Sequence, residues 1–310
     1  MTVFTTPNAL PSTNLSSLYT SGQFALSIEI FPPKTAEGDA ALRQALQEFS
    51  TYNPAFVSCT YGAGGSTRSR TLDWCREIID RVGVAPTAHF TCVGSNSDEL
   101  IEWLGQAWQL GVRNIMALRG DVPQGETEFK AVEGGFSHAR QLVELIRKEF
   151  PEMGIGVAGY PEKHPEAASL ETDIAFLKEK ITAGGHAVFT QLFYDNETFY
   201  RYWEMCLKQG IDAPIIPGVM PITEYSRVKR IVEISGTKVP AELLEQLEAA
   251  HLRDDKAAQL EIGIEYSVQQ CQDLIDHGVP GLHFYVLNKA HATSQILQSL
   301  GLKNSEITTG

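Results

Sequence analysis

Short apolar runs alternate with longer amphipathic segments along almost the whole chain. Several of the short runs are apolar at successive positions and rich in β-branched residues, which is typical of strands buried on both faces of a parallel sheet. Eight predicted strands cover residues 26–31, 56–61, 87–92, 114–119, 154–160, 187–193, 215–220 and 282–287. Amphipathic helices are predicted between them, over residues 39–52, 70–82, 98–110, 137–150, 170–183, 198–209 and 225–235.

Eight strand–helix units predict an α/β fold of the closed (β/α)8 kind, a TIM barrel. An open doubly wound sheet is the alternative. Such a sheet usually carries a glycine-rich fingerprint after its first strand, whereas here that strand runs into Pro32 and Pro33. We expect a single catalytic domain over residues 1–310, with the barrel at 24–300 and a flexible polar tail at 303–310. An insertion at 238–278 should add two helices, 242–250 and 254–276, before the last strand.

Residues that begin and end helices agree with this division. A serine hydroxyl accepts hydrogen bonds from the first turn of a helix, so Ser97 and Ser137 are predicted N-caps. Glycine adopts the left-handed conformation that ends many helices, and Gly111, Gly184 and Gly210 follow the last turns of their helices.

Charge and cysteine content narrow the classes of function. The formal net charge is −13, and a nucleic-acid partner is disfavoured because a surface that follows phosphates needs clustered Lys and Arg. The five cysteines show no C-x-x-C spacing, so neither disulfides nor a zinc site are predicted. No apolar run approaches the ~20 residues that cross a bilayer, and the N-terminus does not resemble a signal peptide. We therefore expect a cytoplasmic protein without a membrane partner.

Polar residues gather at the predicted carboxyl ends of the strands, where a barrel builds its active site. In chain order they are Glu29, Thr60, Tyr61, Gly62, His89, Thr91, Arg119, Gly120, Asp121, Tyr160, Glu162, Gln191, His283, Tyr285, Asn288 and Lys289. A histidine inside a strand is more often a hydrogen-bonded core residue than a catalytic one. Arg119 and Asp121 could equally form an ion pair that closes a loop.

Glu29 stands out because it lies between two isoleucines in an apolar strand. A buried carboxylate either finds a partner or takes up a proton, since burying it unpaired is costly. We therefore expect a raised pKa for Glu29, which would make it a proton donor near neutral pH.

Two further motifs have simpler explanations. Residues 62–67 form a glycine-rich loop that could cradle a phosphate, but the loop lacks the lysine of a nucleotide P-loop, and a tight turn before the next helix explains it as well. Glu162, His164 and Glu166 lack the helical i, i+4 spacing of metalloprotease ligands, so no metal is expected.

The order of eight segments resembles the methylenetetrahydrofolate reductase family. The segments are 27–34 (SIEIFPPK), 57–67 (VSCTYGAGGST), 86–92 (PTAHFTC), 117–121 (ALRGD), 160–166 (YPEKHPE), 190–195 (TQLFYD), 216–221 (IPGVMP) and 283–288 (HFYVLN). Each segment alone is weak evidence for the family. Together, in the right order and spacing, they are specific, and the resemblance covers nearly the whole chain.

The resemblance implies an oxidoreductase that reduces 5,10-methylenetetrahydrofolate to 5-methyltetrahydrofolate, in one-carbon metabolism and methionine supply. FAD is the implied cofactor and NADH or NADPH the implied hydride donor. Opening of the one-carbon bridge needs a proton donor at the folate nitrogen, and the family's first-strand glutamate falls on Glu29. Asp121 is implied to lie near flavin and pterin, where its charge would oppose flavin reduction and favour a cationic folate species.

The same resemblance implies which side chains meet the two ligands. FAD is expected against Thr60, Tyr61, His89, Leu118, Arg119, Gly120, Asp121, Tyr160, His164, Asp173 and Lys180. The substrate is expected against Glu29, Asp121, Gln191, Tyr225, Tyr285 and Lys289. Gln191 would hold the pterin edge through amide hydrogen bonds, Tyr225 would stack on a ring, and Tyr285 and Lys289 would meet the folate tail. Asp173 and Lys180 are two helical turns apart, so both can reach one rim.

The chain departs from the family at a few positions. Tyr225 stands where relatives have Phe, and Lys289 stands where an Arg is expected, which loses a bidentate fork. The regulatory domain that follows the barrel in animal and plant relatives is expected to be missing, as is a cysteine cluster for an iron–sulfur partner. Family members often form homo-oligomers, so a homo-oligomer is a further expectation.

Two other functions stay open on the sequence alone. A Schiff-base lyase or aldolase would need a desolvated lysine inside a strand, whereas Lys289 lies just past a strand and Lys180 on a helix. A non-enzymatic flavin- or folate-binding protein would leave Glu29 and Asp121 unexplained.

Overall fold

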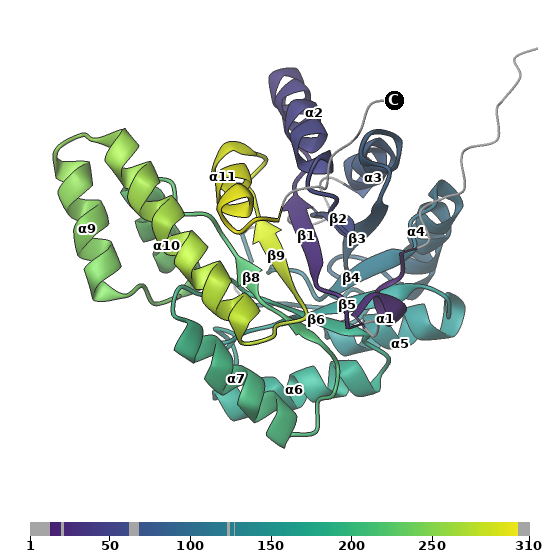
Figure 1. Ribbon diagram of the computed structural model, residues 1–310. Helices are drawn as coiled ribbons and strands as arrows, with labels where there is room; N and C mark the ends of the chain where they lie inside the picture. Colours follow the sequence, from purple (N-terminus) through teal and green to yellow (C-terminus); the bar gives the residue numbers. More distant parts are fainter. Residues whose placement is uncertain (1–12, 20–21, 62–67, 123–124, 127, 303–310) are drawn as a thin grey trace, which may run out of the picture.

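The computed structural model describes residues 13–19, 22–61, 68–122, 125–126 and 128–302, and shows a barrel of parallel strands surrounded by helices (Figure 1). The predicted glycine-rich loop at 62–67 and the tail at 303–310 lie outside the described residues. The strands are β1 (Ala25–Ile30), β2 (Phe56–Cys59), β3 (Ala85–Thr91), β4 (Asn114–Leu118), β5 (Gly154–Gly159), β6 (Ala187–Thr190), β7 (Ile215–Ile216), β8 (Gly218–Val219) and β9 (Gly281–Tyr285). Their order in the sheet is β7-β6-β5-β4-β3-β2-β1-β9-β8.

The barrel closes through a strand that Pro217 divides in two. β7 pairs with β6 and β8 pairs with β9, and Pro217 alone separates β7 from β8. Proline has no N–H to give to a sheet, although its carbonyl still accepts a hydrogen bond from the backbone N–H of His283 at 3.0 Å. The predicted (β/α)8 barrel is confirmed, and the single strand predicted over 215–220 is corrected to two short ones.

The predicted helices are all present, and the structure adds two short ones. The helices that were predicted are α2 (Ala36–Ser50), α3 (Arg68–Val82), α4 (Ser97–Leu110), α5 (Ala139–Glu149), α6 (Leu170–Thr182), α7 (Asn196–Lys208), α8 (Tyr225–Ser235), α9 (Ala241–Leu252) and α10 (Lys256–Asp276). The additions are α1 (Leu15–Leu18) and α11 (His291–Ser299). One turn is too short for a periodic pattern to reveal α1, and buried Thr293 and Ser294 interrupt the apolar pattern of α11.

Both predicted serine N-caps are wrong by one residue. Asn96 caps α4, and its side chain and that of Glu99 exchange hydrogen bonds with the backbone in a capping box. His138 occupies the N-cap position of α5 in place of Ser137. The glycine that ends α4, Gly111, has the predicted left-handed conformation with φ 103°.

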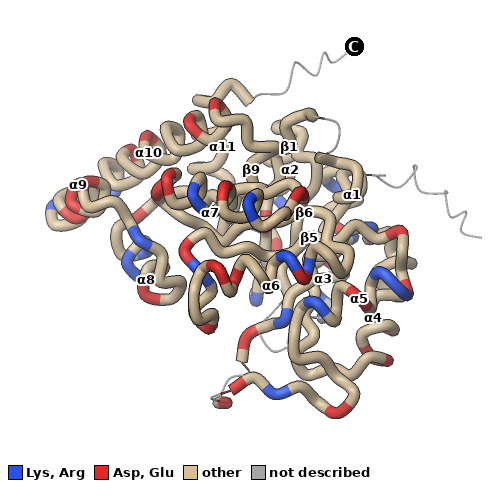
Figure 2. Tube along the Cα trace, turned by 90° about the horizontal axis from the view of Figure 1, so that it is seen from below, with Lys and Arg blue, Asp and Glu red and all other residues tan. Residues whose placement is uncertain are grey.

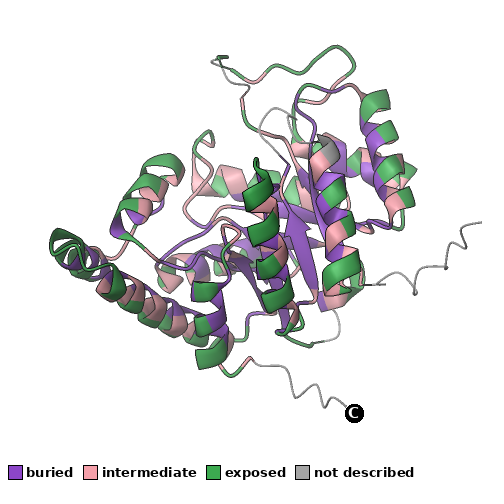
Figure 3. Cartoon of the chain, turned by 90° about the horizontal axis from the view of Figure 1, so that it is seen from above, coloured by how far each residue is buried: buried purple, intermediate pink, exposed green. Residues whose placement is uncertain are grey.

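The strands present one face to the helices and the other to the barrel interior (Figure 3). In β1 the outward side chains Ile28 and Ile30 are fully buried in the main core under the helices. The inward positions of the same strand are Ser27 and Glu29, because successive side chains of a strand point to opposite faces. A smaller apolar cluster around Leu15 of α1 fills the amino-terminal end of the barrel. The half of the barrel interior at the carboxyl-terminal ends of the strands is therefore available to polar side chains.

The inserted helices α9 and α10 pack against each other and against α8 beside the barrel (Figure 1). Tyr225, at the start of α8, and Leu247, in α9, belong to their shared apolar cluster. A helix long and apolar enough to cross a membrane does not occur within the described part of the chain.

Candidate active site

Two adjoining pockets share a wall made of Leu118, Ala158 and Tyr160. The outer pocket has a volume of about 360 Å³ and is lined by Ala117, Leu118, Arg119, His138, Ala139, Arg140, Ala158, Tyr160, His164, Asp173, Phe176, Glu179 and Lys180. The inner pocket has a volume of about 330 Å³ and is lined by Glu29, His89, Met116, Leu118, Ala158, Tyr160, Phe189, Gln191, Leu192, Met220, His283, Tyr285 and Leu287. Ligands in the two pockets would meet at the shared wall.

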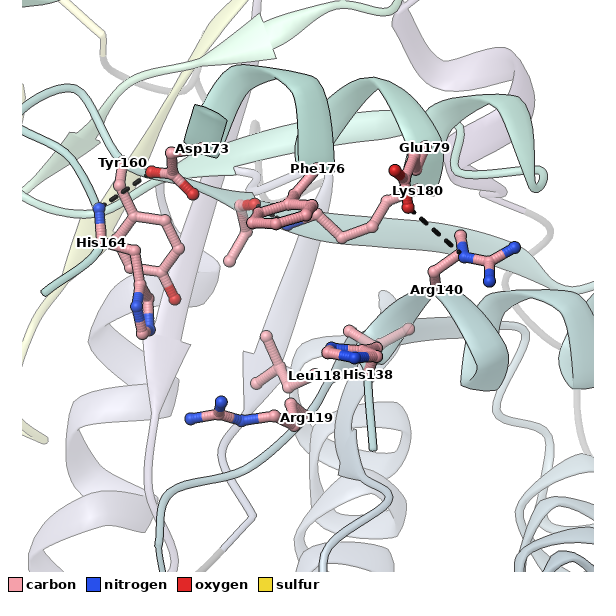
Figure 4. Close-up of a pocket in the computed structure, with 13 residues that line it drawn as sticks. Leu118, Arg119, His138, Arg140, Tyr160, His164, Asp173, Phe176, Glu179 and Lys180 are labelled. Atoms are coloured by element: carbon pink, nitrogen blue, oxygen red, sulfur yellow. Dashed lines mark hydrogen bonds and ion pairs between the residues drawn. The ribbon is translucent and has the colours of Figure 1, made fainter. Parts of the chain in front are cut away.

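Cationic side chains reach the outer pocket from three elements (Figure 4). Arg119 follows β4, Arg140 lies in the first turn of α5 and Lys180 in the last turn of α6. The Lys180 ammonium donates to the carbonyl of Ala158 at 2.6 Å. Burial lowers the pKa of Lys180 to about 8, although Asp173 favours its charged form. An ammonium whose hydrogen bond goes to a neutral carbonyl keeps its positive charge available for an anion.

His164 is fixed in the wall of the outer pocket by hydrogen bonds on either side. Its backbone N–H donates to Asp173 Oδ2 at 2.8 Å, and its Nδ1 accepts from the backbone N–H of Glu166 at 3.1 Å. Burial lowers the pKa of His164. A neutral ring that accepts at Nδ1 carries its proton on Nε2, so His164 is a hydrogen-bond donor for a ligand.

Arg119, Gly120 and Asp121 form a turn beside the shared wall. Gly120 has φ +92°, and a Cβ at this position would lie 2.7 Å from Val93 Cγ1, so that only glycine fits without strain. The Arg119 guanidinium binds the Glu166 carboxylate through two hydrogen bonds of 2.6 and 2.7 Å. Asp121 is exposed, and its charge acts on the pKa of both Arg119 and Tyr160. Burial, reinforced by the nearby acids, raises the pKa of Tyr160 to about 12.

Glu29 lies in the inner pocket between two histidines. Its Oε2 is 3.0 Å from His89 Nε2 and 3.4 Å from His283 Nε2. His283 is completely buried, and its Nδ1 lies 2.8 Å from Ser27 Oγ. Strands β1, β3 and β9 thus bring these residues together from distant parts of the chain.

The expected raised pKa of Glu29 is contradicted by these contacts. Burial raises the pKa, but the charge of His89 and the hydrogen bond with His283 outweigh burial and lower the pKa to about 2. Glu29 is therefore ionised at neutral pH. A proton that Glu29 delivers must first reach it, and the two imidazoles beside it are suited to carry one.

Gln191 and Tyr285 complete the polar lining of the inner pocket. Gln191 Oε1 accepts from the backbone N–H of Leu192 at 2.9 Å, which orients the amide. The Tyr285 hydroxyl donates to the carbonyl of Thr190 at 2.6 Å. Gly218, just after the break at Pro217, makes this possible, because a Cβ there would lie 2.6 Å from Tyr285 Cε2.

Six predicted site residues line neither pocket: Thr60, Tyr61, Gly120, Asp121, Tyr225 and Lys289. Thr60 accepts a hydrogen bond from Thr71 through its carbonyl, at 3.0 Å. Tyr61 packs edge-on against Phe90 and Trp103 under the helices. The Tyr225 hydroxyl donates to Glu248 Oε1 at 2.6 Å on α9, and Lys289 is exposed after β9. Their roles as ligand contacts remain predictions.

The sequence analysis missed several lining residues. Phe176 lies three positions after Asp173 and four before Lys180, so the helical spacing that joined those two residues also pointed to Phe176. His138 and Arg140 begin a helix after a long loop, where no periodic signal exists. Arg140 Nε lies 3.5 Å from Glu179 Oε2 and thus connects α5 with α6 across the pocket (Figure 4).

These features define a (β/α)8 barrel with a pocket that Arg119, Arg140 and Lys180 line beside a second pocket that holds the Glu29 carboxylate. The sequence pattern of the methylenetetrahydrofolate reductase family matches residues 14–301, and the chain belongs to this family. It is 35% identical to 5,10-methylenetetrahydrofolate reductase of Escherichia coli, over 94% of this chain and 95% of that protein.

Plant relatives are similar in sequence but longer. The chain is 38% identical to methylenetetrahydrofolate reductase (NADH) 1 of Arabidopsis thaliana, over 93% of this chain and 50% of that protein. It therefore spans about half the length of this relative.

The fold occurs in solved structures of other proteins. One is an uncharacterized protein from Clostridium thermocellum, with a TM-score of 0.58 and 13% identity over 92% of this chain and 97% of that one. The other is oxaloacetate acetylhydrolase, with a TM-score of 0.53 and 11% identity over 97% of this chain and 91% of that one. At such low identity these likenesses support the barrel and nothing more.

Proposed function

We propose that this chain catalyses the reduction of 5,10-methylenetetrahydrofolate to 5-methyltetrahydrofolate, with NADH or NADPH as hydride donor and FAD as bound cofactor. The observation that carries the proposal is the shared wall at Leu118, Ala158 and Tyr160, with cations on one side and Glu29 on the other. Relatives are named as reductases with NADH in plants and with NADPH in Caenorhabditis elegans. The fold neighbour from Clostridium thermocellum is described as binding 5-methyl-5,6,7,8-tetrahydrofolic acid.

The outer pocket has the donors that FAD requires. Arg119, Arg140 and Lys180 offer positive charge to the diphosphate, and His164 offers an N–H. Tyr160 lies on the shared wall, where the ring system of a flavin would face the inner pocket. When bound, FAD supplies the hydride-transfer chemistry, while the protein orients both ligands.

In the inner pocket, Glu29 and Gln191 have complementary roles. The Gln191 amide, held by Leu192, would orient the pterin edge. Glu29 would pass a proton to the folate nitrogen as the one-carbon bridge opens, after taking that proton from the side of His89 and His283. Asp121, whose charge acts on Tyr160, would stabilise a cationic folate species.

A spectroscopic experiment tests the whole proposal. Protein purified with FAD should be yellow, and NADH or NADPH should bleach its flavin absorption under anaerobic conditions. Addition of methylenetetrahydrofolate should then restore the absorption. Protein that does not bind FAD, or reduced flavin that the folate does not reoxidise, would reject the proposal.

A further inference from the structure

Asn288 follows β9 at the mouth of the barrel and has no part in the chemistry described so far. Its side-chain amide makes two hydrogen bonds to a single residue, Phe31. Nδ2 donates to the Phe31 carbonyl at 2.7 Å, and Oδ1 accepts from the Phe31 backbone N–H at 3.0 Å. This pair of hydrogen bonds, the Asn288 clasp, fixes the orientation of the amide, because only its nitrogen can donate.

The Asn288 clasp continues a ladder of strand pairing beyond its end. β1 and β9 are parallel neighbours (Figure 2), and their last paired residues are Glu29 and Tyr285. The two residues after Phe31 are prolines, which have no N–H to donate to a neighbouring strand. The amide of Asn288 therefore offers Phe31 the donor and the acceptor that a further residue of β9 would have supplied.

The backbone around Asn288 adopts an unfavourable conformation. Leu287 and Asn288 have φ values of 48° and 59°, and within the described part of the chain no other two consecutive non-glycine residues have positive φ. The Lys289 backbone N–H donates to the carbonyl of Val286 at 2.9 Å, which closes a tight turn around the pair. Asparagine tolerates this region better than leucine does. Such a turn persists where its surroundings hold it, and this one places Leu287 in the wall of the inner pocket.

We propose that Asn288 is a positioning residue that holds Glu29 in place for the folate half of the reaction. The inference rests on the proposed function, in which Glu29 passes a proton to the folate nitrogen. Glu29 lies in the last pair of the β1–β9 ladder, where strand pairing frays most easily. The Asn288 clasp ties down the chain two residues further on. Proton transfer needs this precision, because a displacement of about 1 Å can slow a reaction about 100-fold.

Glycine at position 288 tests the inference, because it separates the clasp from the turn. Asn288→Gly removes both hydrogen bonds but adopts φ 59° without strain. The turn should stay in place while the end of β1 loosens. In flavin-loaded protein, the limiting rate of flavin reoxidation by methylenetetrahydrofolate should fall about tenfold, and the folate concentration that gives half of this rate should change less than about threefold. Bleaching by NADH or NADPH should stay within about twofold of the wild-type rate.

Two further variants complete the comparison. Asn288→Ala removes the clasp and also strains the turn, so it should weaken folate binding as well as slow reoxidation. Asn53→Gly is the matched control. Asn53 is exposed, has φ 49° and precedes β2, at the opposite end of the barrel. Its replacement should leave bleaching and reoxidation at their wild-type rates.

Three results would overturn the inference. The first is an unchanged limiting rate of reoxidation in Asn288→Gly, whatever its folate affinity, since the turn alone would then matter. The second is an equal slowing by Asn288→Gly and Asn53→Gly. The third is an equal loss of bleaching and reoxidation in Asn288→Gly, since the substitution would then act on the whole fold. Reduced wild-type flavin that the folate does not reoxidise is a separate result, which would reject the proposed function itself.

Discussion

The Oε2 atom of Glu29 lies 3.0 Å from Nε2 of His89 inside the barrel. His283 approaches the same oxygen from β9, at 3.4 Å. The carboxylate is thus surrounded by groups that stabilise its charge, and its pKa falls to about 2 despite burial. Because Glu29 is ionised at neutral pH, the proposed reaction needs a route by which a proton reaches this carboxylate.

Acid should therefore destabilise the wild type more than a variant that lacks this carboxylate. A carboxyl group whose pKa is lowered by folding stabilises the protein above its unfolded pKa, and that stabilisation is lost as the pH falls from about 5 toward 2. For Glu29 the loss is up to about 3 kcal/mol relative to Glu29→Gln. Urea unfolding of both proteins at pH 7, 5, 4 and 3 measures it. Parallel pH dependences for the two proteins would contradict the ion pairing.

The Glu29→Gln variant should also separate the two halves of the reaction. Glutamine keeps the shape of the side chain but cannot transfer a proton. Bleaching of the flavin by NADH or NADPH should proceed within a few-fold of the wild-type rate, whereas folate turnover should fall by about 100-fold or more. Stopped-flow absorbance measures each half separately. Folate turnover that survives the substitution would remove Glu29 from its proposed role.

Lys180 should control the affinity for FAD. The variant Lys180→Met removes a charged donor from the outer pocket and should raise the Kd for FAD about 10- to 100-fold. Because the pKa of Lys180 is lowered to about 8, wild-type affinity should fall as the pH rises through 8, and the affinity of the variant should not. Fluorescence titration of the FAD-free protein measures both effects.

A neighbouring lysine provides the control for this experiment. Lys178 lies on the same helix, is exposed and does not line the pocket. Lys178→Met should leave the Kd for FAD and its pH dependence unchanged. An equal effect of both substitutions would mean that Lys180 acts only through net charge.

The turn at Gly120 should not tolerate a side chain. Gly120→Ala forces a residue with a Cβ into φ +92° and against Val93, and should lower the free energy of unfolding by about 1–3 kcal/mol. Gly105→Ala is the matched control, because a Cβ on that α4 residue meets no atom within 4 Å and alanine favours a helix. Gly105→Ala should be neutral or stabilise by up to about 1 kcal/mol. Equal unfolding energies for the two variants would contradict the strained turn.

The pattern of apolar and polar positions predicted the helices and strands well, and predicted the residues at which they begin and end less well. Strands buried on both faces and amphipathic helices have local signatures, so the barrel and both inserted helices could be predicted. The caps at Asn96 and His138 and the break at Pro217 depended on backbone hydrogen bonds that a periodic pattern does not report.

Some residues that line the two pockets could be predicted from the sequence, and others could not. Glu29, Tyr160, Gln191 and Tyr285 could be placed because every parallel strand of a barrel delivers its last residues to one end. Arg140 could not, since it lines the pocket only because α5 happens to lie across from α6.

The sequence by itself determined that polar side chains at the strand ends would share one mouth, because alternation along a strand and the common direction of the strands are local properties. Only the tertiary structure decided the charge of Glu29. Two opposing effects act on this carboxylate, and the winning one comes from His89 and His283, whose distances to it are set by how the strands pack. Burial can be inferred from neighbours in sequence, whereas electrostatic partners are neighbours only in space.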